Sequence, residues 1–297
     1  FNSKPKNIFA VTGTNGKSSV AEFFHQILTL NNIPVATIGT LGIKTKTLKK
    51  NDLTSPDVIS LHKELAKIKE KKIDNVMIEA SSHGLAQGRL DGINIKTGIF
   101  TNFSQDHLDY HKTMKNYFNA KLILFKKMLK KNSSVITDNN IQEFQKIKKI
   151  ILKKNLRLLL IESFQNKYGL KNFKLIGNFQ KKNLMMAIAT SELCGLNRKK
   201  ISKSIGKLKN VKGRLELVKI FPNGTKVFVD FAHTPDALKR VLEVLKKSVG
   251  KNIVLVFGCG GERDVKKRPL MAKIAGKNCK TIYVTDDNPR KEKPERI

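Results

Sequence analysis

The sequence predicts an α/β fold in which helices cover a mostly parallel sheet. Two observations lead to this class. Short apolar runs end in turn residues, and each run is followed by a segment whose apolar residues recur with the helical period. The length of 297 residues adds a third, because it suits about two domains that each bury a core.

The first part of the chain alternates strands with helices. Ile8–Val11 is an uninterrupted apolar run and predicts a buried strand, while Ser18–Leu30 carries its apolar residues on one side. Pro56 suits the first turn of a helix that reaches about Lys71. The other strands expected are Pro34–Ile38, Val76–Ala80, Thr97–Thr101, Ser134–Thr137 and Leu158–Ile161, and the other helices Met114–Leu129, Ile141–Leu152, Asn183–Cys194 and Lys199–Leu208.

The same alternation restarts after Gly213, which predicts a second α/β domain of Rossmann-like type. We place the boundary between residues 1–212 and 213–297. The expected elements are the strands Lys226–Asp230, Ile253–Phe257 and Thr281–Thr285 and the helices Asp236–Ser248 and Arg268–Gly276.

The charge raises the possibility of a nucleic-acid-binding protein. Lys and Arg number 58 against 24 Asp and Glu, a formal net charge of +34. Only nine of the 58 are Arg, which leaves 49 Lys, and these are spread through almost every segment. No zinc-finger spacing, RNP1 string or heptad-plus-basic region is present. A solvated lysine-rich surface is therefore favoured, and nucleic-acid binding remains the alternative from another functional class.

Hydropathy and cysteine usage indicate a cytoplasmic protein without a membrane partner. No apolar run is long enough for a transmembrane helix. The three cysteines form no metal-binding or CxxC spacing. The first residue is Phe and no secretory signal follows it, so we expect a reduced, cytoplasmic setting and a chain that is a fragment.

A glycine-rich loop follows the first predicted strand and opens the first helix. Its residues are Gly13, Thr14, Asn15, Gly16, Lys17, Ser18 and Ser19. Glycines allow a phosphate to approach the backbone, the helix N-terminus offers free N–H groups, and Lys17 adds a positive charge. The Ser18 hydroxyl can reach a Mg²⁺ ion on the phosphates. This loop predicts a P-loop-type ATP-binding domain, although Val11 replaces the first glycine of the longer motif.

Acidic and histidine residues follow two further strands. Glu79 ends one strand, where a carboxylate points into the ligand crevice of such sheets. The segment Asp106–His111 follows the next and contains two Asp and two His, including His107. Carboxylates at this edge could hold Mg²⁺. Lys121, on the following helix, is by pattern alone a solvated lysine.

Three charged turns in the second half of the chain predict one polar cleft. Asp230 could accept a hydrogen bond from a ribose hydroxyl. In the turn 257–264, Arg263, with Lys267 and Arg268 after it, suits an anionic ligand. In the turn 285–290, Arg290 offers a planar fork for a carboxylate and Asp287 an acceptor for an amine.

Together these strings resemble the Mur ligase family, most closely its diaminopimelate-adding UDP-N-acetylmuramoyl-tripeptide synthetases (MurE). The matching strings are GTNGKSS at 13–19, EASSHGLAQGR at 79–89, TNFSQDHLDYH at 101–111, NAK at 119–121, GRLE at 213–216, VDFAHTPDAL at 229–238, FGCGGERD at 257–264 and DDNPR at 286–290. The phosphate loop alone would also admit the related folylpolyglutamate synthetases, which remain the alternative within the superfamily.

The resemblance implies a reaction, its cofactors and its site residues. ATP, with Mg²⁺, would phosphorylate UDP-MurNAc-L-Ala-D-Glu, and an amine of meso-diaminopimelate would attack the acyl phosphate. Lys17 would be catalytic, together with the metal-site positions Ser18, Glu79, His107 and Lys121, the last as a carbamate. Thr54, Ser55, Ser81, Gln87 and Arg89 match contacts to the UDP-sugar peptide, and Asn183, Arg214 and Asp230 the nucleotide side. Arg263, Asp287, Asn288, Pro289 and Arg290 match amino-acid recognition.

The resemblance also implies what lies outside the chain. We expect the family's N-terminal uridine-binding domain and the end of its last domain to be absent, and the protein to be a monomer. Several positions depart from the usual pattern. Gln180 stands where Asn is usual, Gln105 where Arg is usual, Phe231 where Tyr is usual and Glu262 where Asp is usual.

Overall fold

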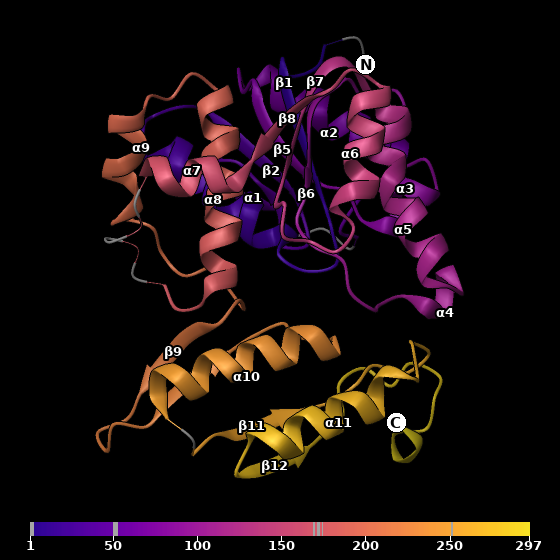
Figure 1. Cartoon of the computed structure of the whole chain (residues 1–297), viewed down its shortest axis with the longest axis vertical. Helices are drawn as coiled ribbons and strands as arrows, with labels where there is room; N and C mark the ends of the chain where they lie inside the picture. The colour runs from indigo at the N-terminus through magenta and orange to yellow at the C-terminus, as the bar shows by residue number, and fades with distance from the viewer. Residues whose placement is uncertain (1–2, 50–52, 169, 171–172, 174, 251) are drawn as a thin grey trace. The chain divides into compact units, whose positions relative to one another are not determined.

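The computed structural model describes residues 3–49, 53–168, 170, 173, 175–250 and 252–297. The chain forms two compact units, coloured along the sequence in Figure 1. Unit 1 comprises Phe1–Phe103 and Phe118–Val211, and unit 2 comprises Ser104–Tyr117 and Lys212–Ile297. The segment Ser104–Tyr117 therefore belongs with the second half of the chain, although it lies in the first half of the sequence.

Unit 1 is built on an eight-stranded sheet with the order β4-β3-β2-β5-β1-β6-β7-β8. All pairs from β2 to β8 are parallel, and only the β2–β3 and β3–β4 pairs are antiparallel. The mostly parallel α/β architecture expected from the sequence is confirmed. The strands are β1 Asn7–Thr12, β2 Val35–Gly39, β3 Gly42–Lys44, β4 Leu48–Lys49, β5 Asn75–Glu79, β6 Ile95–Phe100, β7 Leu129–Thr137 and β8 Arg157–Leu160.

Strand β1 shows why its sequence is uniformly apolar. Side chains alternate between the two faces of a sheet, and both faces here are covered. Phe9 and Val11 enter one hydrophobic core, and Ile8 and Ala10 enter a second. The first core includes the helices α1 (Lys17–Leu30), α7 (Ile161–Tyr168), α8 (Asn178–Leu193) and α9 (Arg198–Ile205), and the second includes α2 (Val58–Glu70), α5 (Met114–Ile123) and α6 (Phe144–Lys153). Figure 1 shows these two helical layers on opposite sides of the sheet.

Helices α1, α2, α6 and α9 begin and end within three residues of the predicted positions, whereas α8 begins at Asn178, five residues before the predicted start. Helix α2 has Asp57 as its N-cap, whose carboxylate accepts a hydrogen bond from the Ser60 N–H, as expected for a short acidic residue at that position. The helices are α1 Lys17–Leu30, α2 Val58–Glu70, α3 Ser82–Ala86, α5 Met114–Ile123, α6 Phe144–Lys153, α7 Ile161–Tyr168, α8 Asn178–Leu193 and α9 Arg198–Ile205. The first turn of α5, up to Tyr117, belongs to unit 2.

One predicted helix is too long. The segment Met114–Leu129 was expected to be a single helix, but α5 ends at Ile123 and one π-helical turn covers Leu124–Met128. Leu129 then begins β7, where it is 1% exposed and pairs with Ile95 of β6. Burial of Leu129 in the sheet overrides the local helical pattern. Strands β3 and β4 and the short helices α3 and α7 were not predicted from the sequence.

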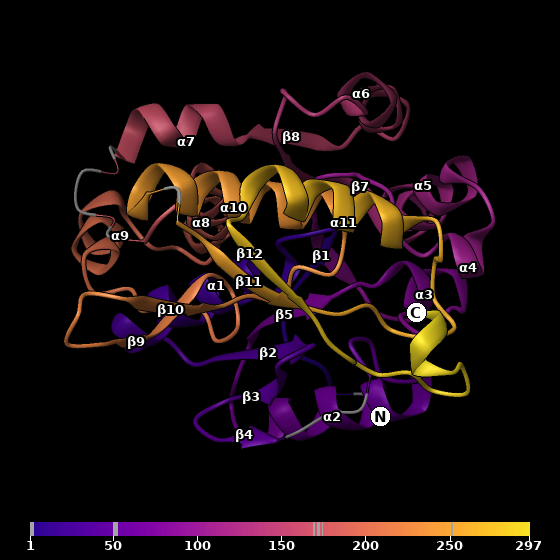
Figure 2. The same ribbon diagram turned by 90° about the horizontal axis from the view of Figure 1, so that it is seen from below.

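Unit 2 contains two small sheets and two long helices. Strands β9 Glu216–Ile220 and β10 Lys226–Val229 are antiparallel, whereas β11 Val254–Phe257 and β12 Thr281–Val284 are parallel. Helices α10 Pro235–Val249 and α11 Lys267–Asn278 lie side by side, as Figure 2 shows. The short helix α4 Leu108–His111 also belongs to this unit, and a 3₁₀ turn covers Pro294–Arg296. Strand β9 was not predicted. Every helix among the described residues is too short or too polar to cross a bilayer.

Candidate active site

The glycine-rich loop joins β1 to α1 at the carboxyl edge of the unit 1 sheet. Gly16 is the N-cap of α1 and has φ +91°, in the left-handed region that favours glycine. A Cβ atom on Gly13 would lie 1.9 Å from the Thr101 hydroxyl oxygen, so this position has no room for a side chain. The Thr14 N–H donates to the Asn102 carbonyl at 3.0 Å, which fixes the loop against the residues that follow β6.

Lys17 folds back over the loop that precedes it. Its Nζ donates to the carbonyl oxygens of Gly13 at 3.0 Å and Thr14 at 2.8 Å. The ammonium is thus held at the mouth of a loop whose helix N-terminus favours anions. This is the arrangement expected of a phosphate-binding loop.

Ser18 and Glu79 meet at the same edge of the sheet. The Ser18 hydroxyl donates to Glu79 Oε2 at 3.0 Å, and the Glu79 side chain is buried. Thr40 adds a backbone N–H donor to Oε1 at 3.0 Å and a hydroxyl donor to Oε2 at 3.2 Å. A carboxylate and a hydroxyl are hard oxygen donors of the kind that Mg²⁺ prefers.

The few oxygen donors at this point suit a Mg²⁺ ion whose other ligands are water and phosphates. They do not suit a metal ion whose ligands are all protein side chains. Among the described residues, no group of three or more His, Cys, Asp or Glu side chains comes together in a way that could hold a metal ion. Mg²⁺ is commonly bound by one or two carboxylates together with water and substrate phosphates. Ser18 and Glu79, beside a phosphate loop, provide such a partial site.

Lys121 corrects one reading of the sequence. By pattern it was a solvated lysine, but it is 1% exposed and its Nζ donates to the Gly13 carbonyl at 2.8 Å. Helix α5 therefore directs this lysine into the protein, against the phosphate loop. A fully buried lysine is unusual, because burial of a charge is costly without compensating partners.

Asn183 of α8 lies against the same loop from another side. A Cβ atom on Gly16 would lie 2.5 Å from Asn183 Oδ1, and the asparagine is 6% exposed. Of the residues predicted to contact the nucleotide, Asn183 is thus placed next to the loop of unit 1, while Arg214 and Asp230 belong to unit 2.

The residues expected to contact the UDP-sugar peptide form a network beside Glu79. The buried Ser55 hydroxyl donates to the Glu79 carbonyl at 2.8 Å and accepts from the Ser81 N–H at 3.0 Å. Arg89 Nη1 donates to the Ser55 carbonyl at 2.8 Å, and the Thr54 hydroxyl lies 3.1 Å from that of Thr40. Gln87 is exposed at the end of α3.

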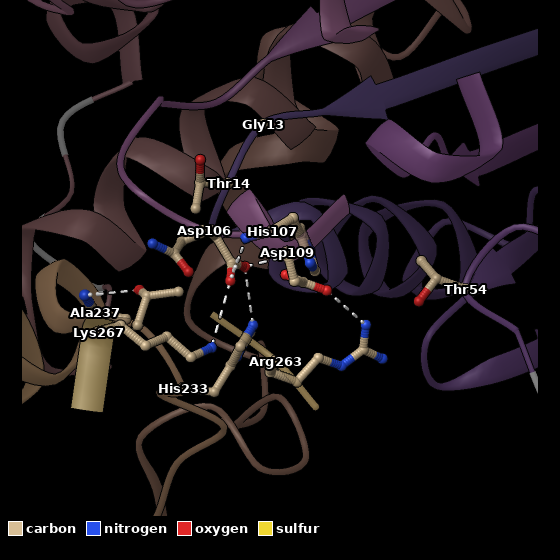
Figure 3. Close-up of polar contacts among 12 residues, drawn as sticks. Gly13, Thr14, Thr54, Asp106, His107, Asp109, His233, Ala237, Arg263 and Lys267 are labelled. Carbon is tan, nitrogen blue, oxygen red and sulfur yellow. Dashed lines mark hydrogen bonds and ion pairs between the residues drawn. The ribbon is translucent and has the colours of Figure 1, made fainter. Parts of the chain in front are cut away.

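In unit 2, the buried carboxylate of Asp106 is the centre of a second polar cluster (Figure 3). Its Oδ2 lies 3.2 Å from Nε2 of both His107 and His233, and its Oδ1 lies 3.4 Å from Lys267 Nζ. Burial by itself raises the pKa of Asp106. The hydrogen bond from His233 and the charges of His107, His233 and Lys267 outweigh that effect and hold the pKa well below its usual range. The carboxylate is therefore ionised.

The basic residues in and just after the turn 257–264 already have carboxylate partners. Arg263 Nη1 lies 3.5 Å from Asp109 Oδ2, Lys267 pairs with Asp106, and Arg268 pairs with Glu292. Lys267 and Arg268 are buried. The anions that these two residues bind are side chains of the protein itself, which corrects the expectation that they face an external ligand.

The turns 257–264 and 285–290 of unit 2 are joined by hydrogen bonds. The Gly261 N–H donates to the Asn288 carbonyl at 2.9 Å, and Arg290 Nη1 donates to the Gly261 carbonyl at 2.6 Å. The turn that contains Asp287, Asn288, Pro289 and Arg290 thus lies against the turn that contains Arg263. Their approach brings together the residues predicted to recognise the amino acid.

Asp230 and Arg214 lie near the start of unit 2. Asp230 Oδ2 accepts from the Leu215 N–H at 2.6 Å, and burial raises the pKa of this carboxyl. The Arg214 guanidinium lies 4.5 Å from the Phe231 ring centroid, a cation–π contact. No signal in the sequence pointed to Thr40, whereas Asp106 lies in the segment Asp106–His111, whose density of acids and histidines had marked it.

The comparisons with known proteins agree with this geometry. The Mur ligase middle domain matches residues 11–191, and the Mur ligase glutamate ligase domain matches residues 213–297. The chain belongs to the Mur ligase family. This Mur ligase is 39% identical over 322 residues to the UDP-N-acetylmuramoyl-L-alanyl-D-glutamate–2,6-diaminopimelate ligase of Rickettsia bellii, covering 99% of this chain and 67% of that protein.

Other relatives give the same result. A Chelativorans protein of the same name is 36% identical to this Mur ligase over 100% of this chain and 66% of its own length. A solved structure of such a ligase has a TM-score of 0.69 at 31% identity and covers 99% of this chain and 64% of its own. The chain thus spans about two thirds of the length of the relatives it matches.

A ligand-free folylpolyglutamate synthase/dihydrofolate synthase from Yersinia pestis reaches a TM-score of 0.74 at 16% identity, over 99% of this chain and 80% of its own. At that identity the likeness shows only that the Mur ligase and this enzyme share a fold.

Proposed function

We propose that the polypeptide is an ATP-dependent acid–amino-acid ligase that joins meso-diaminopimelate to UDP-MurNAc-L-Ala-D-Glu during peptidoglycan precursor synthesis. One observation carries this proposal. The loop that holds Lys17 and the Ser18–Glu79 pair occurs in a chain that is 39% identical, over 99% of its length, to a ligase with those substrates in its name. We place the reaction in the cytoplasm, with a monomer as the active species.

The reaction needs positioning and charge neutralisation more than covalent help from the protein. The γ-phosphoryl group of ATP passes to the free γ-carboxylate of D-Glu, which forms an acyl phosphate and ADP. The neutral amine of diaminopimelate then attacks the acyl carbon, phosphate leaves, and the amine loses a proton as the amide forms. Lys17, which holds the Gly13 and Thr14 carbonyls, would exchange these contacts for phosphate oxygens.

Ser18 and Glu79 are the residues of unit 1 that would hold Mg²⁺, and His107 and a carbamylated Lys121 are the further ligands we expect. Bound Mg²⁺ supplies neutralisation of the phosphate charge. Carbamylation would convert the buried Lys121 cation into a carboxylate-like anion. The burial of Lys121 and its contact with Gly13 support this assignment, because a neutral or anionic group is better suited to a site that collects a cation.

The substrate-binding residues fall into three groups. Thr54, Ser55, Ser81, Gln87 and Arg89 would bind or position the UDP-sugar peptide, and Asn183, Arg214 and Asp230 would serve the nucleotide. Arg263 and the turn Asp287–Arg290 would recognise the amino acid. Arg290 matters most here, because a guanidinium fork suits the distal carboxylate of diaminopimelate, which lysine lacks. We assign the central ATP-binding Mur ligase domain to residues 1–212 and the C-terminal Mur ligase domain to residues 213–297.

Phosphate release tests the proposal in the longest natural polypeptide that contains this chain. We expect release to require ATP, a divalent cation, UDP-MurNAc-L-Ala-D-Glu and meso-diaminopimelate together. Lysine in place of diaminopimelate should support at most a few per cent of the rate, and Arg290→Lys should reduce this preference. Equal turnover with lysine would contradict the role of Arg290.

Two other functions predict different results in the same assays. A folylpolyglutamate-type ligase would require a pteridine substrate and ignore the UDP-sugar. A nucleic-acid-binding protein would bind nucleic acid with a steep salt dependence, and Lys17→Ala would leave that binding unchanged.

A further inference from the structure

The segment Ser104–Tyr117, which we call the strap, is bound by unit 2 although residues of unit 1 precede and follow it in the sequence. The strap includes the short helix α4. His107 before α4 and Lys112 after it have φ +54° and φ +65°. Residues with a side chain keep this left-handed conformation only where the surrounding contacts hold it. The conformation of the strap therefore depends on its partners in unit 2.

Lys267, at the start of α11, holds the strap through a buried ion pair. Its Nζ lies 3.4 Å from Asp106 Oδ1, and the two side chains are 7% and 3% exposed (Figure 3). The same carboxylate oxygen accepts a hydrogen bond from the His107 N–H at 2.9 Å, so the pair also fixes the backbone just before α4. Removal of one partner from such a pair leaves a buried charge without compensation, which costs far more than the loss of an ion pair at the surface.

The turn 257–264 adds two further contacts to the strap. Gln105 Nε2 donates to Oδ2 of the buried Asp264 at 3.0 Å. Arg263 Nη1 lies 3.5 Å from Asp109 Oδ2, but the arginine side chain is 41% exposed. An ion pair that is open to water contributes little, so this second contact holds the strap more weakly than the buried pair does.

Both ends of the strap lead to residues that hold the phosphate loop in unit 1. Asn102, two residues before the strap, accepts from the Asn15 N–H through Oδ1 and donates to the Asn15 carbonyl through Nδ2, each at 2.9 Å. Lys121, four residues after the strap, donates to the Gly13 carbonyl at 2.8 Å. Lys121 lies on α5, whose first turn is part of the strap. The strap thus connects the contacts in unit 2, through the covalent chain, to two residues that shape the loop.

We propose that Lys267 is a positioning residue for phosphoryl transfer: through Asp106 it fixes the strap, and the strap keeps Asn102 and Lys121 against the phosphate loop. This inference rests on the ligase function proposed above. It gives a role to a buried lysine that the mechanism does not use. A misplacement of about 1 Å among the groups around a reacting phosphate is enough to slow the reaction about 100-fold. The main effect is therefore on the rate at which bound substrates react.

The kinetics of phosphate release test the proposal in the longest natural polypeptide that contains this chain. Lys267→Met should lower kcat at least about 30-fold and change the KM for ATP less than about threefold. Lys267→Arg keeps a cation against Asp106 and should retain kcat within about fivefold. Lys266→Met is the matched control, because it removes the same charge from the preceding, exposed position; kcat should stay within about twofold.

A double-mutant cycle tests whether Lys267 acts through Asp106. In the Asp106→Asn background, Lys267→Met should lower kcat less than about threefold, because the buried pair is already lost. A loss of about 30-fold in both backgrounds would show that Lys267 acts by another route and would overturn the proposal. If Lys267→Met alone does not fold, Lys267→Gln takes its place, since its amide can donate to Asp106 without a charge; kcat should then fall at least about tenfold.

Hydrogen–deuterium exchange provides a measurement that does not depend on activity. Lys267→Met should raise the exchange rate of backbone amides in the strap at least about tenfold, and leave exchange in β11 and β12 unchanged. A slow variant with native exchange in the strap would overturn the proposal, as would faster exchange in the strap with a normal kcat. Native protein that releases no phosphate with any substrate would instead refute the ligase function itself.

Discussion

Arg268 and Glu292 form a two-pronged ion pair, in which Nη1 and Nη2 each lie 2.7 Å from a different carboxylate oxygen. The Arg268 side chain is 8% exposed, so the pair is partly shielded from water. Glu292 Oε2 also accepts from the Glu262 N–H at 2.9 Å. The pair therefore links α11, the turn 257–264 and the segment after Arg290, and it supports both turns proposed to recognise the amino acid.

This ion pair predicts a defined acid sensitivity. The Arg268 hydrogen bond, with that of the Glu262 N–H, lowers the pKa of Glu292 from 4.5 to about 2. Because the folded-state pKa is the lower one, the stabilisation is complete above the ordinary value and is lost as pH falls towards 2. The thermal midpoint should fall more between pH 6 and pH 3 in the native chain than in Glu292→Gln. Equal falls would contradict this role.

Because Gly16 lies against Asn183, Gly16→Ala should lower the unfolding free energy by more than backbone strain alone accounts for. Gly16→Ala places a methyl group at φ +91° and 2.5 Å from Asn183 Oδ1. Gly195→Ala is the matched control. Gly195 has φ +86°, and no atom of another residue lies within 4 Å of a Cβ placed there. Strain costs both variants about 1–2 kcal/mol, and the clash adds about 1–3 kcal/mol to the first.

Urea titration of Gly16→Ala and Gly195→Ala measures how much unfolding free energy each variant loses. The double variant Gly16→Ala/Asn183→Ala should recover part of the difference, since it removes the clashing amide. Equal losses for Gly16→Ala and Gly195→Ala would show that Asn183 does not pack on the loop.

Replacement of Ser55, which was first assigned to substrate binding, should lower the stability of the fold. Its hydroxyl is buried and satisfies both the Glu79 carbonyl and the Ser81 N–H. Ser55→Ala leaves both groups unpaired and should lower the unfolding free energy by about 2–4 kcal/mol. Ser163→Ala removes one hydrogen bond at an exposed site and should cost less than about 1 kcal/mol. A Ser55→Ala loss as small as that of Ser163→Ala would rule out the positioning role.

We expect Lys121 to be carbamylated. Mass spectrometry under mild, neutral conditions should find a carbamate on this residue, and the adduct should be lost after acid treatment. Lys121→Ala should reduce phosphate release by at least about 100-fold, and added short-chain carboxylates should restore part of the activity. Lys115→Ala, which removes an exposed lysine from the same helix, should retain the rate. An unmodified Lys121 in an active enzyme would refute the carbamate.

Local patterns were enough to predict the parallel strands of the unit 1 sheet, the phosphate loop and the placement of Glu79. Each of these depends on neighbouring residues: an apolar run that forms a buried strand, glycines at a turn, or a polar residue where a strand ends. The helix over Met114–Leu129 was too long because the helical period of that segment ignores the sheet pairing of Leu129.

The sequence by itself determined the α/β architecture and the positions of the loops that carry the chemistry. Only the tertiary structure decided where Lys121, Asp106 and Lys267 lie. Hydrophobic periodicity reports which side of an element is apolar, but a buried charge depends on partners that are distant in sequence. Lys121 meets Gly13 over 108 residues, and Lys267 meets Asp106 over 161. Such contacts exist only after the chain has folded.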